Sequence, residues 1–152
     1  MPSESGLGDQ PLNSPAPSRS ESAIFTWKGS GEAILADDEP TVRSVAARAL
    51  QRLGLTVTQC VDGREAVALV QADPARWRLV VLDLTMPVLA GDMALEQILA
   101  IRSDLGAIIY SGYSEDEMRG SFAGRPGVGF LQKPFTVRAL SDAVAGVLGP
   151  SA

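Results

Sequence analysis

Acidic, hydroxyl and amine side chains follow four of the apolar runs in this sequence. Asp37 and Asp38 come directly after one run, Asp83 ends a second, and Ser111 and Lys133 stand at the ends of two more. Two carboxylates about 4 Å apart repel by about 4 kcal/mol at an effective dielectric of about 20, so gathered acids need a cation. Because the chain has no histidine, the donors would be hard oxygens, which favour Mg²⁺, with Mn²⁺ as a substitute.

A lysine beside these acids would support phosphoryl transfer. The chain has two lysines, Lys28 and Lys133. A compact ammonium at residue 133 can pair with Asp83 and then with phosphoryl oxygens, to which Ser111 can also donate a hydrogen bond. The set predicts Asp83 as a carboxylate nucleophile for in-line transfer, with Lys133 and Ser111 as its electrostatic support.

These side chains converge only if parallel strands position them. Apolar runs alternate with segments whose apolar residues recur every three or four positions, which predicts alternating strands and helices. We expect strands over residues 33–36, 55–61, 77–83, 107–111 and 128–132. We expect helices over residues 40–53, 62–72, 92–102, 114–122 and 136–147, with Asp62 and Thr136 as the caps of the second and the last. Right-handed crossovers then give a doubly wound α/β fold, a parallel sheet with helices on both faces and a shared carboxyl edge.

Composition divides the chain of 152 residues into three parts. Residues 1–22 contain six Ser, four Pro and two Gly with few apolar side chains, which predicts disorder. Residues 23–31 are expected to form a linker, and residues 32–149 the globular domain.

Charge and composition also exclude several functions. With 18 acidic against 13 basic residues and a net charge of −5, we expect no nucleic-acid partner. The absence of histidine excludes His-dependent catalysis and a role as phosphohistidine donor. The single cysteine, Cys60, excludes an internal disulfide and is expected to be a small buried residue. Without a spanning apolar run or a secretory signal, we expect a cytoplasmic protein without membrane contact.

Four short motifs follow the predicted strands. They are Asp37-Asp38-Glu39-Pro40, Asp83-Leu84-Thr85-Met86-Pro87, Ser111-Gly112 and Phe130-Leu131-Gln132-Lys133-Pro134-Phe135. Together they resemble the signatures of response regulator receiver domains. Their order and spacing match the family over residues 32–149. The resemblance implies a flavodoxin-like sheet of five strands in the order 2-1-3-4-5, with five helices.

The resemblance implies that Asp83 takes phosphate from a histidine kinase or a histidine phosphotransfer protein. It further implies Mg²⁺ held by Asp38, Asp83 and the backbone carbonyl of Thr85, with Asp37 acting through water. Asp37 and Asp38 have a plainer explanation too, because acids at the start of a helix also serve as caps, here of the helix that begins at Pro40.

Lys133 and Ser111 would bind the phosphoryl oxygens, and the Lys133–Pro134 peptide bond would be cis. Phosphate on Asp83 would draw Ser111 toward it and let Phe130, the aromatic switch, turn inward. The face made by the fourth helix, fifth strand and fifth helix would then change its affinity for a downstream partner, through a population shift between two packings. A phosphorylation-dependent homodimer is one such outcome.

Several alternatives stay open at this stage. The chain is either a single-domain regulator or, as the junction-like residues 24–31 favour, the C-terminal receiver of a hybrid histidine kinase. It is not expected to be a stand-alone enzyme. A haloacid-dehalogenase-type phosphatase also uses an aspartate nucleophile and Mg²⁺, but it needs a second acid where Thr85 stands. A pseudo-receiver scaffold is disfavoured by the complete set of acids, hydroxyl and lysine.

Overall fold

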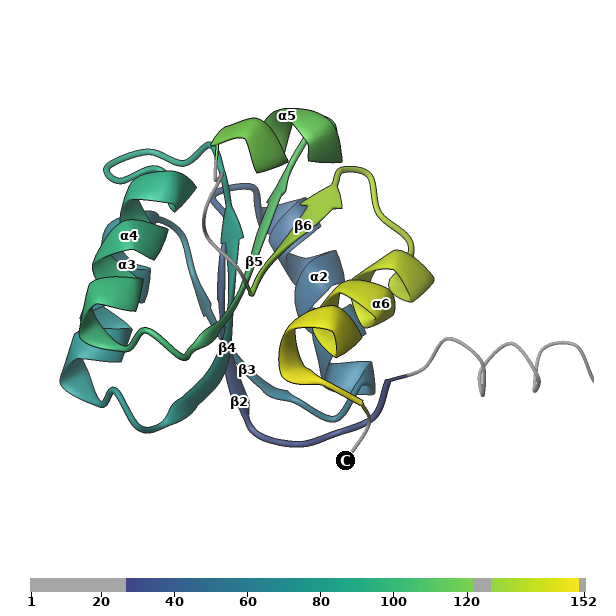
Figure 1. Cartoon of the computed structure of the whole chain (residues 1–152), viewed down its shortest axis with the longest axis horizontal. Coiled ribbons are helices and arrows are strands. Elements are labelled where there is room, and N and C mark those ends of the chain that lie inside the picture. Colours follow the sequence, from purple (N-terminus) through teal and green to yellow (C-terminus); the bar gives the residue numbers. More distant parts are fainter. Residues whose placement is uncertain (1–26, 122–126, 151–152) are drawn as a thin grey trace, which may run out of the picture.

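Five parallel strands form the central sheet of this computed structural model, which describes residues 27–121 and 127–150 (Figure 1). The strands are β2 (Glu32–Ala36), β3 (Thr56–Cys60), β4 (Trp77–Asp83), β5 (Gly106–Ser111) and β6 (Val128–Gln132). Their spatial order is β3-β2-β4-β5-β6, which confirms the predicted order 2-1-3-4-5. The prediction of disorder over residues 1–22 lies outside the described residues.

Five helices cover the two faces and the upper edge of the sheet. They are α2 (Pro40–Arg52), α3 (Gly63–Ala72), α4 (Gly91–Ile101), α5 (Glu115–Ser121) and α6 (Val137–Leu148). Helices α3 and α4 lie on one side of the sheet and α2 and α6 on the other (Figure 1). The caps are those that the sequence predicts, because the side chains of Asp62 and Thr136 accept hydrogen bonds from the backbone of Glu65 and Ala139.

The predicted elements differ from the observed ones only at their ends. The second predicted strand, 55–61, is shorter by one residue at each end, and the first helix ends at Arg52 rather than at residue 53. Leu53 is the C-cap of that helix, and Gly54 follows it with a φ of +101°. Helix ends commonly fray by one or two residues.

The core is divided into two apolar layers by the sheet. Successive strand residues point to opposite faces, so Ile34, Val80 and Ile109 pack toward α3 and α4, whereas Leu35 and Val81 pack toward α2 and α6. Fully burying such aliphatic side chains stabilises the fold by about 1.5–3 kcal/mol each.

Residues 27–31, the described part of the expected linker, lie against the domain. Trp27 is 4% exposed and belongs to the apolar layer under α2 and α6. No helix within the described ranges has the length and apolar character needed to cross a bilayer.

Candidate functional site

Asp37, Asp83 and Lys133 come together at the carboxyl edge of the sheet, on the side of α2 and α6. Side chains on a strand alternate between faces, so Asp37 continues the face of Leu35 and Asp83 continues the face of Val81. Strands β2 and β4 are neighbours in parallel register. The two acids therefore end adjacent strands on one face.

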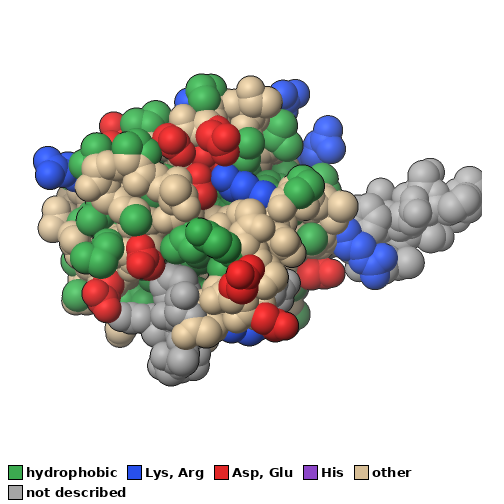
Figure 2. All heavy atoms as spheres, turned by 90° about the horizontal axis from the view of Figure 1, so that it is seen from above, with side chains coloured by type: hydrophobic (Ala, Val, Ile, Leu, Met, Phe, Trp, Pro, Cys, Tyr) green, Lys and Arg blue, Asp and Glu red, His purple; other side chains and the backbone are tan. Residues whose placement is uncertain are grey.

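The Lys133 ammonium lies among three carboxylates. Its Nζ is 3.2 Å from Asp83 Oδ2, 3.3 Å from Glu39 Oε1 and 3.5 Å from Asp37 Oδ2. One oxygen of each acid lies within 4.8 Å of the others. Figure 2 looks down on this edge, where acidic side chains gather beside a basic one. Three negative charges and one positive charge leave the cluster at −2 when all four groups are ionised.

The pKa of Asp83, which is 4% exposed, is shifted in opposite directions by its surroundings. Burial, and then the charge of Asp37, raise the pKa of Asp83 to about 6, while Lys133 and the backbone N–H of Thr85 partly offset them. Burial lowers the pKa of Lys133, but the charges of Asp83 and Asp37 outweigh it and leave that pKa above its usual value. At neutral pH the pair is therefore an ionised carboxylate beside an ammonium.

The described cluster includes Glu39 and not Asp38. Asp38 is exposed and lies outside the three-acid group, whereas Glu39 is a member of it. The sequence motif did not indicate Glu39, because the direction of its side chain depends on the bend that the backbone makes at Asp38. Thr85 is exposed, and its N–H donates to Asp83 Oδ1 over 3.3 Å. Metal binding by Asp38 and by the Thr85 carbonyl stays a prediction.

Ser111 ends β5 and is buried at 4% exposure. Its Oγ accepts a hydrogen bond from the N–H of Tyr113 over 3.2 Å, and its carbonyl accepts one from the N–H of Lys133 over 2.6 Å. The backbone thus ties Ser111 to the lysine, while binding of phosphoryl oxygens by its hydroxyl stays a prediction. The Lys133–Pro134 peptide bond is cis, as expected.

Phe130 lies on β6, three residues before Lys133, and belongs to the apolar layer under α3 and α4. It is 7% exposed, and the guanidinium carbon of Arg119 lies 5.1 Å from the centre of its ring. The ring therefore already lies inward in this structure, so the predicted inward turn is not seen here and the switching role stays a prediction.

The sequence interpretation missed Tyr110, a member of the site. This residue of β5 is fully buried, and its hydroxyl donates to Asp37 Oδ2 over 2.5 Å. Burial, then the hydrogen bond to Asp37, raise the pKa of Tyr110 above its usual value, so the hydroxyl stays a donor. An aromatic residue inside an apolar strand looks like core, and its place opposite Asp83 follows from the strand register, which the sequence does not show.

Cys60 lies outside the acidic cluster. It is a buried free cysteine, as expected, and burial raises the pKa of its thiol to about 12. The thiolate needed for reactivity is therefore scarce at neutral pH. Its carbonyl accepts the backbone N–H of Asp37 over 3.1 Å, which helps to fix the first acid of the site.

The acidic cluster suits a hard divalent cation. The carboxylates of Asp37, Glu39 and Asp83 offer oxygen ligands close together, the donor type that such cations take in proteins. A divalent ion would also balance the net charge of −2 that remains when the Lys133 ammonium has offset one of the three carboxylates. The donor set contains neither imidazole nor thiolate, because the chain has no histidine and its cysteine is outside the cluster.

Comparison with known proteins gives one consistent family. A model described as the response regulator receiver domain matches residues 33–145. The chain is 33% identical over 120 residues to the sensor kinase CckA of Brucella abortus (strain 2308), covering 79% of this chain and 13% of that protein. It is 32% identical over 114 residues to the tetrathionate response regulatory protein TtrR of Salmonella typhimurium, covering 75% and 54%. The chain thus spans only part of the length of these relatives.

Solved structures agree with the fold. The receiver domain of the hybrid histidine kinase CckA superposes with a TM-score of 0.65 at 30% identity, covering 78% of this chain and 99% of that one. A response regulator receiver protein from Sinorhizobium medicae WSM419 superposes with a TM-score of 0.70 at 26% identity, covering 78% and 94%.

Proposed function

Because the chain belongs to the response regulator receiver family of two-component systems, we propose that it takes a phosphoryl group from phosphohistidine onto Asp83. The observation that carries this proposal is the Lys133 ammonium, 3.2 Å from the carboxylate of a buried aspartate at the carboxyl edge of the sheet. Ligands of open α/β sheets bind at that edge. Asp83 is thus an anion held beside a fixed positive charge.

The transfer forms one bond and breaks another. A carboxylate oxygen of Asp83 attacks the phosphorus, the P–N bond to the donor imidazole breaks, and the imidazole keeps the electron pair and takes up a proton. The product on this chain is an aspartyl phosphate. Because the chain has no histidine, the donor is a histidine kinase or a phosphotransfer protein supplied by another polypeptide or another part of a longer one.

Each residue of the site has a role in this reaction. Bound Mg²⁺ would neutralise charge on the phosphoryl oxygens as they approach the acids. Asp83 and its neighbouring acids Asp37 and Glu39 would hold the ion, together with the predicted ligands Asp38 and the Thr85 carbonyl. Lys133 would move its hydrogen bonds from carboxylates to the incoming phosphoryl oxygens, with Ser111 as a second donor. Both donors would stabilise charge that builds up in the transition state.

The test is phosphorylation of the full chain by a small donor such as acetyl phosphate, with Mg²⁺ or with EDTA, followed by intact-mass measurement. We expect one phosphoryl group per chain with Mg²⁺ and little labelling with EDTA. Asp83→Asn should abolish labelling, and the exposed Asp73→Asn is the matched control that should keep it. Labelling of the Asp83→Asn variant at the wild-type level would contradict the proposal.

The same experiment separates the two alternative functions. A phosphatase would release phosphate from the donor over many turnovers, whereas labelling of a receiver is stoichiometric and self-limited. A pseudo-receiver scaffold would show no labelling with or without Mg²⁺. The geometry favours the receiver because the exposed Thr85 stands where the phosphatase needs its second acid.

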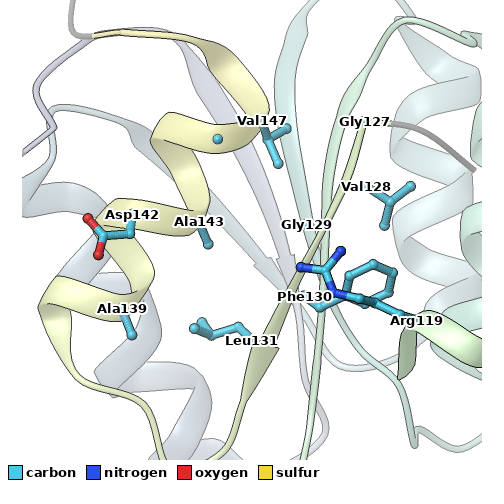
Figure 3. A pocket seen from close by; sticks show the side chains of 11 residues that line it. Arg119, Gly127, Val128, Gly129, Phe130, Leu131, Ala139, Asp142, Ala143 and Val147 are labelled. Atoms are coloured by element: carbon cyan, nitrogen blue, oxygen red, sulfur yellow. The ribbon is translucent and has the colours of Figure 1, made fainter. Parts of the chain in front are cut away.

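We place the downstream partner on the face made by α5, β6 and α6. A pocket of about 470 Å³ lies there, between Phe130 and Leu131 of β6 and the α6 residues Ala143 and Val147. Figure 3 shows Arg119 against the Phe130 ring at one side of this pocket. Movement of Phe130 would therefore change the shape of the pocket directly.

Hydrogen exchange tests the link between the acceptor and this face. Phosphorylation should change the exchange rates of β6 and α6 amides in the wild type, and Asp83→Asn treated with the same donor should show no change. Unchanged rates in a fully phosphorylated wild type would contradict the assignment of this face. Whether the partner is a separate protein or a second phosphorylated copy follows from the oligomeric state in the same samples.

A further inference from the structure

Tyr110 joins the sheet core to the phosphoacceptor site. It lies on β5 in register with Asp83 of β4, and its side chain is fully buried on the α2 and α6 side. Its hydroxyl donates to Asp37 Oδ2 over 2.5 Å, although 73 positions separate the two residues. A buried neutral donor therefore meets a buried carboxylate at the edge where the chemistry is proposed.

Both oxygens of Asp37 are held by hydrogen bonds. Oδ1 accepts the backbone N–H of Glu39 over 2.9 Å, and Oδ2 accepts the hydroxyl of Tyr110. Asp37 is 0% exposed, so water does not replace a lost donor cheaply, and an unmade hydrogen bond to a buried charge is costly. The carboxylate is thus fixed in one orientation.

The Tyr110 ring also contacts the ammonium of Lys133. Lys133 Nζ lies 4.8 Å from the ring centre, within the range of a cation–π contact. On another side the ring meets Phe135 edge-on, with centres 5.8 Å apart and planes at 81°. One side chain therefore orients Asp37 through its hydroxyl and contacts the ammonium through its ring.

We propose that Tyr110 is a positioning residue that keeps Lys133 on Asp83. The tyrosine hydroxyl satisfies Asp37 Oδ2, from which the ammonium stays 3.5 Å away while it lies 3.2 Å from Asp83 Oδ2. Without the hydroxyl, the ammonium, already 3.5 Å from that buried oxygen, moves toward Asp37. Asp83 and the phosphoryl group then lose part of their support, and the acids that hold Mg²⁺ lose their fixed arrangement. This inference rests on the proposed function.

The test is Tyr110→Phe in the full chain, which keeps the ring and removes the hydroxyl. Partners of metal-site residues typically contribute about 10–100-fold to metal affinity or activity. We expect Mg²⁺ affinity, measured by calorimetry, to fall about tenfold. We expect the limiting rate of phosphorylation by acetyl phosphate to fall by a similar factor, with the half-saturating donor concentration unchanged.

Ile108→Val is the matched control for simple loss of stability. Ile108 is on the same strand and the same face, two residues earlier, and is fully buried. Shortening it costs about 0.5–1.5 kcal/mol without touching the site. We expect its Mg²⁺ affinity and labelling rate to match those of the wild type. If this variant loses as much as Tyr110→Phe, the effect is general destabilisation and the inference is overturned.

A double-mutant cycle with Asp37→Asn tests whether the hydroxyl acts through Asp37. In the Asp37→Asn background, adding Tyr110→Phe should change Mg²⁺ affinity and labelling rate less than about twofold. A full tenfold loss in that background would overturn the inference. If Tyr110→Phe alone fails to fold because Asp37 is left unpaired, the same comparison between the single Asp37→Asn and the double variant decides the question.

The outcomes separate this inference from the proposed function. If the wild type is labelled and Tyr110→Phe equals it in rate and Mg²⁺ affinity, the positioning role is wrong and the receiver function stands. If the wild type is not labelled, the proposed function fails, and the calorimetric difference between wild type and Tyr110→Phe still decides whether Tyr110 organises the acids.

Discussion

The two ends of the parallel sheet carry different kinds of side chain, charged at the carboxyl end and apolar at the amino end. At the carboxyl end, the buried carboxylates of Asp37 and Asp83 lie beside the half-buried ammonium of Lys133. At the amino end, Trp27 covers the lower edge of the core and leaves 4% of its surface exposed. Figure 1 shows the segment before β2 crossing below the sheet, opposite the edge beside α5.

Hydrogen bonds also hold the amino end. The N–H of Trp27 donates to the hydroxyl of the buried Ser141 over 2.7 Å, and its indole N–H donates to the Gly149 carbonyl over 2.9 Å. Gly29 donates to the Leu53 carbonyl over 2.9 Å. The amino end therefore stabilises the domain, whereas the carboxyl end holds buried charges that lower its stability and are suited to chemistry. Substitutions at the two ends should therefore shift stability in opposite directions.

Trp27→Ala should give the largest loss of stability. Truncating a buried aromatic residue typically costs about 3–5 kcal/mol, and here the indole N–H hydrogen bond to Gly149 is lost as well. Urea unfolding followed by circular dichroism measures the change. Trp27→Phe, which keeps a ring but not the indole N–H, should lose clearly less. A loss below about 1 kcal/mol for Trp27→Ala would show that the segment only rests on the domain.

Gly54→Ala should give the second largest loss, again at the amino end. Gly54 has a φ of +101°, and an added Cβ would collide with the Gly29 carbonyl oxygen. Strained backbone of this kind costs about 1–3 kcal/mol. Gly146→Ala is the matched control, because Gly146 lies in α6 with open space around the new methyl group. That change should raise stability by about 0.5–1 kcal/mol, so a loss of equal size in both variants would refute the account.

The fold could be predicted from the sequence because the patterns that indicate its strands and helices are local. The run from Trp77 to Asp83 and the caps at Asp62 and Thr136 each depend on a few neighbouring residues, and the structure confirms them. Trp27 was harder to place. Its contacts are with Ser141 and with a carbonyl 122 positions away, and no local pattern in a segment with linker composition predicts them.

The sequence predicted several residues of the site from the strand ends, but it did not predict the contacts that the site residues make with one another. Strand ends gave Asp83 and Lys133, because the carboxyl ends of parallel strands share one edge. The choice between Asp38 and Glu39 depends on the backbone direction after β2, which the motif alone does not define. Tyr110 was hidden because a hydroxyl inside an apolar strand has no local sign of its distant acceptor.

Asp83→Asn should raise stability, in contrast to the losses at the other end. Burial and the charge of Asp37 raise the pKa of Asp83 to about 6 from an ordinary 3.8. The folded state thus binds this proton more tightly than the unfolded state, so the wild type loses stability as pH rises through that interval. Removing the charge should add about 1–2 kcal/mol at about pH 8 and little at about pH 4.

Urea unfolding with EDTA at the two pH values measures this difference, and the exposed Asp73→Asn serves as the control. A gain that is the same at both pH values would show that charge is not its cause. A loss at the higher pH would show that the ion pair with Lys133 outweighs burial, and would remove the contrast between the two ends.

Val88→Gly should give the smallest change, a gain of about 1 kcal/mol at the carboxyl end. Val88 lies in the loop after Asp83 with a φ of +68° and is 67% exposed, so its side chain adds little packing. A left-handed conformation costs an L-residue roughly 1–2 kcal/mol, and glycine removes that cost but loses some of the gain through its freer unfolded chain. Val88→Ala keeps the Cβ and should gain less. Equal stability of the two variants in urea unfolding would show that the loop holds no such strain, and that buried charge alone distinguishes this end of the sheet.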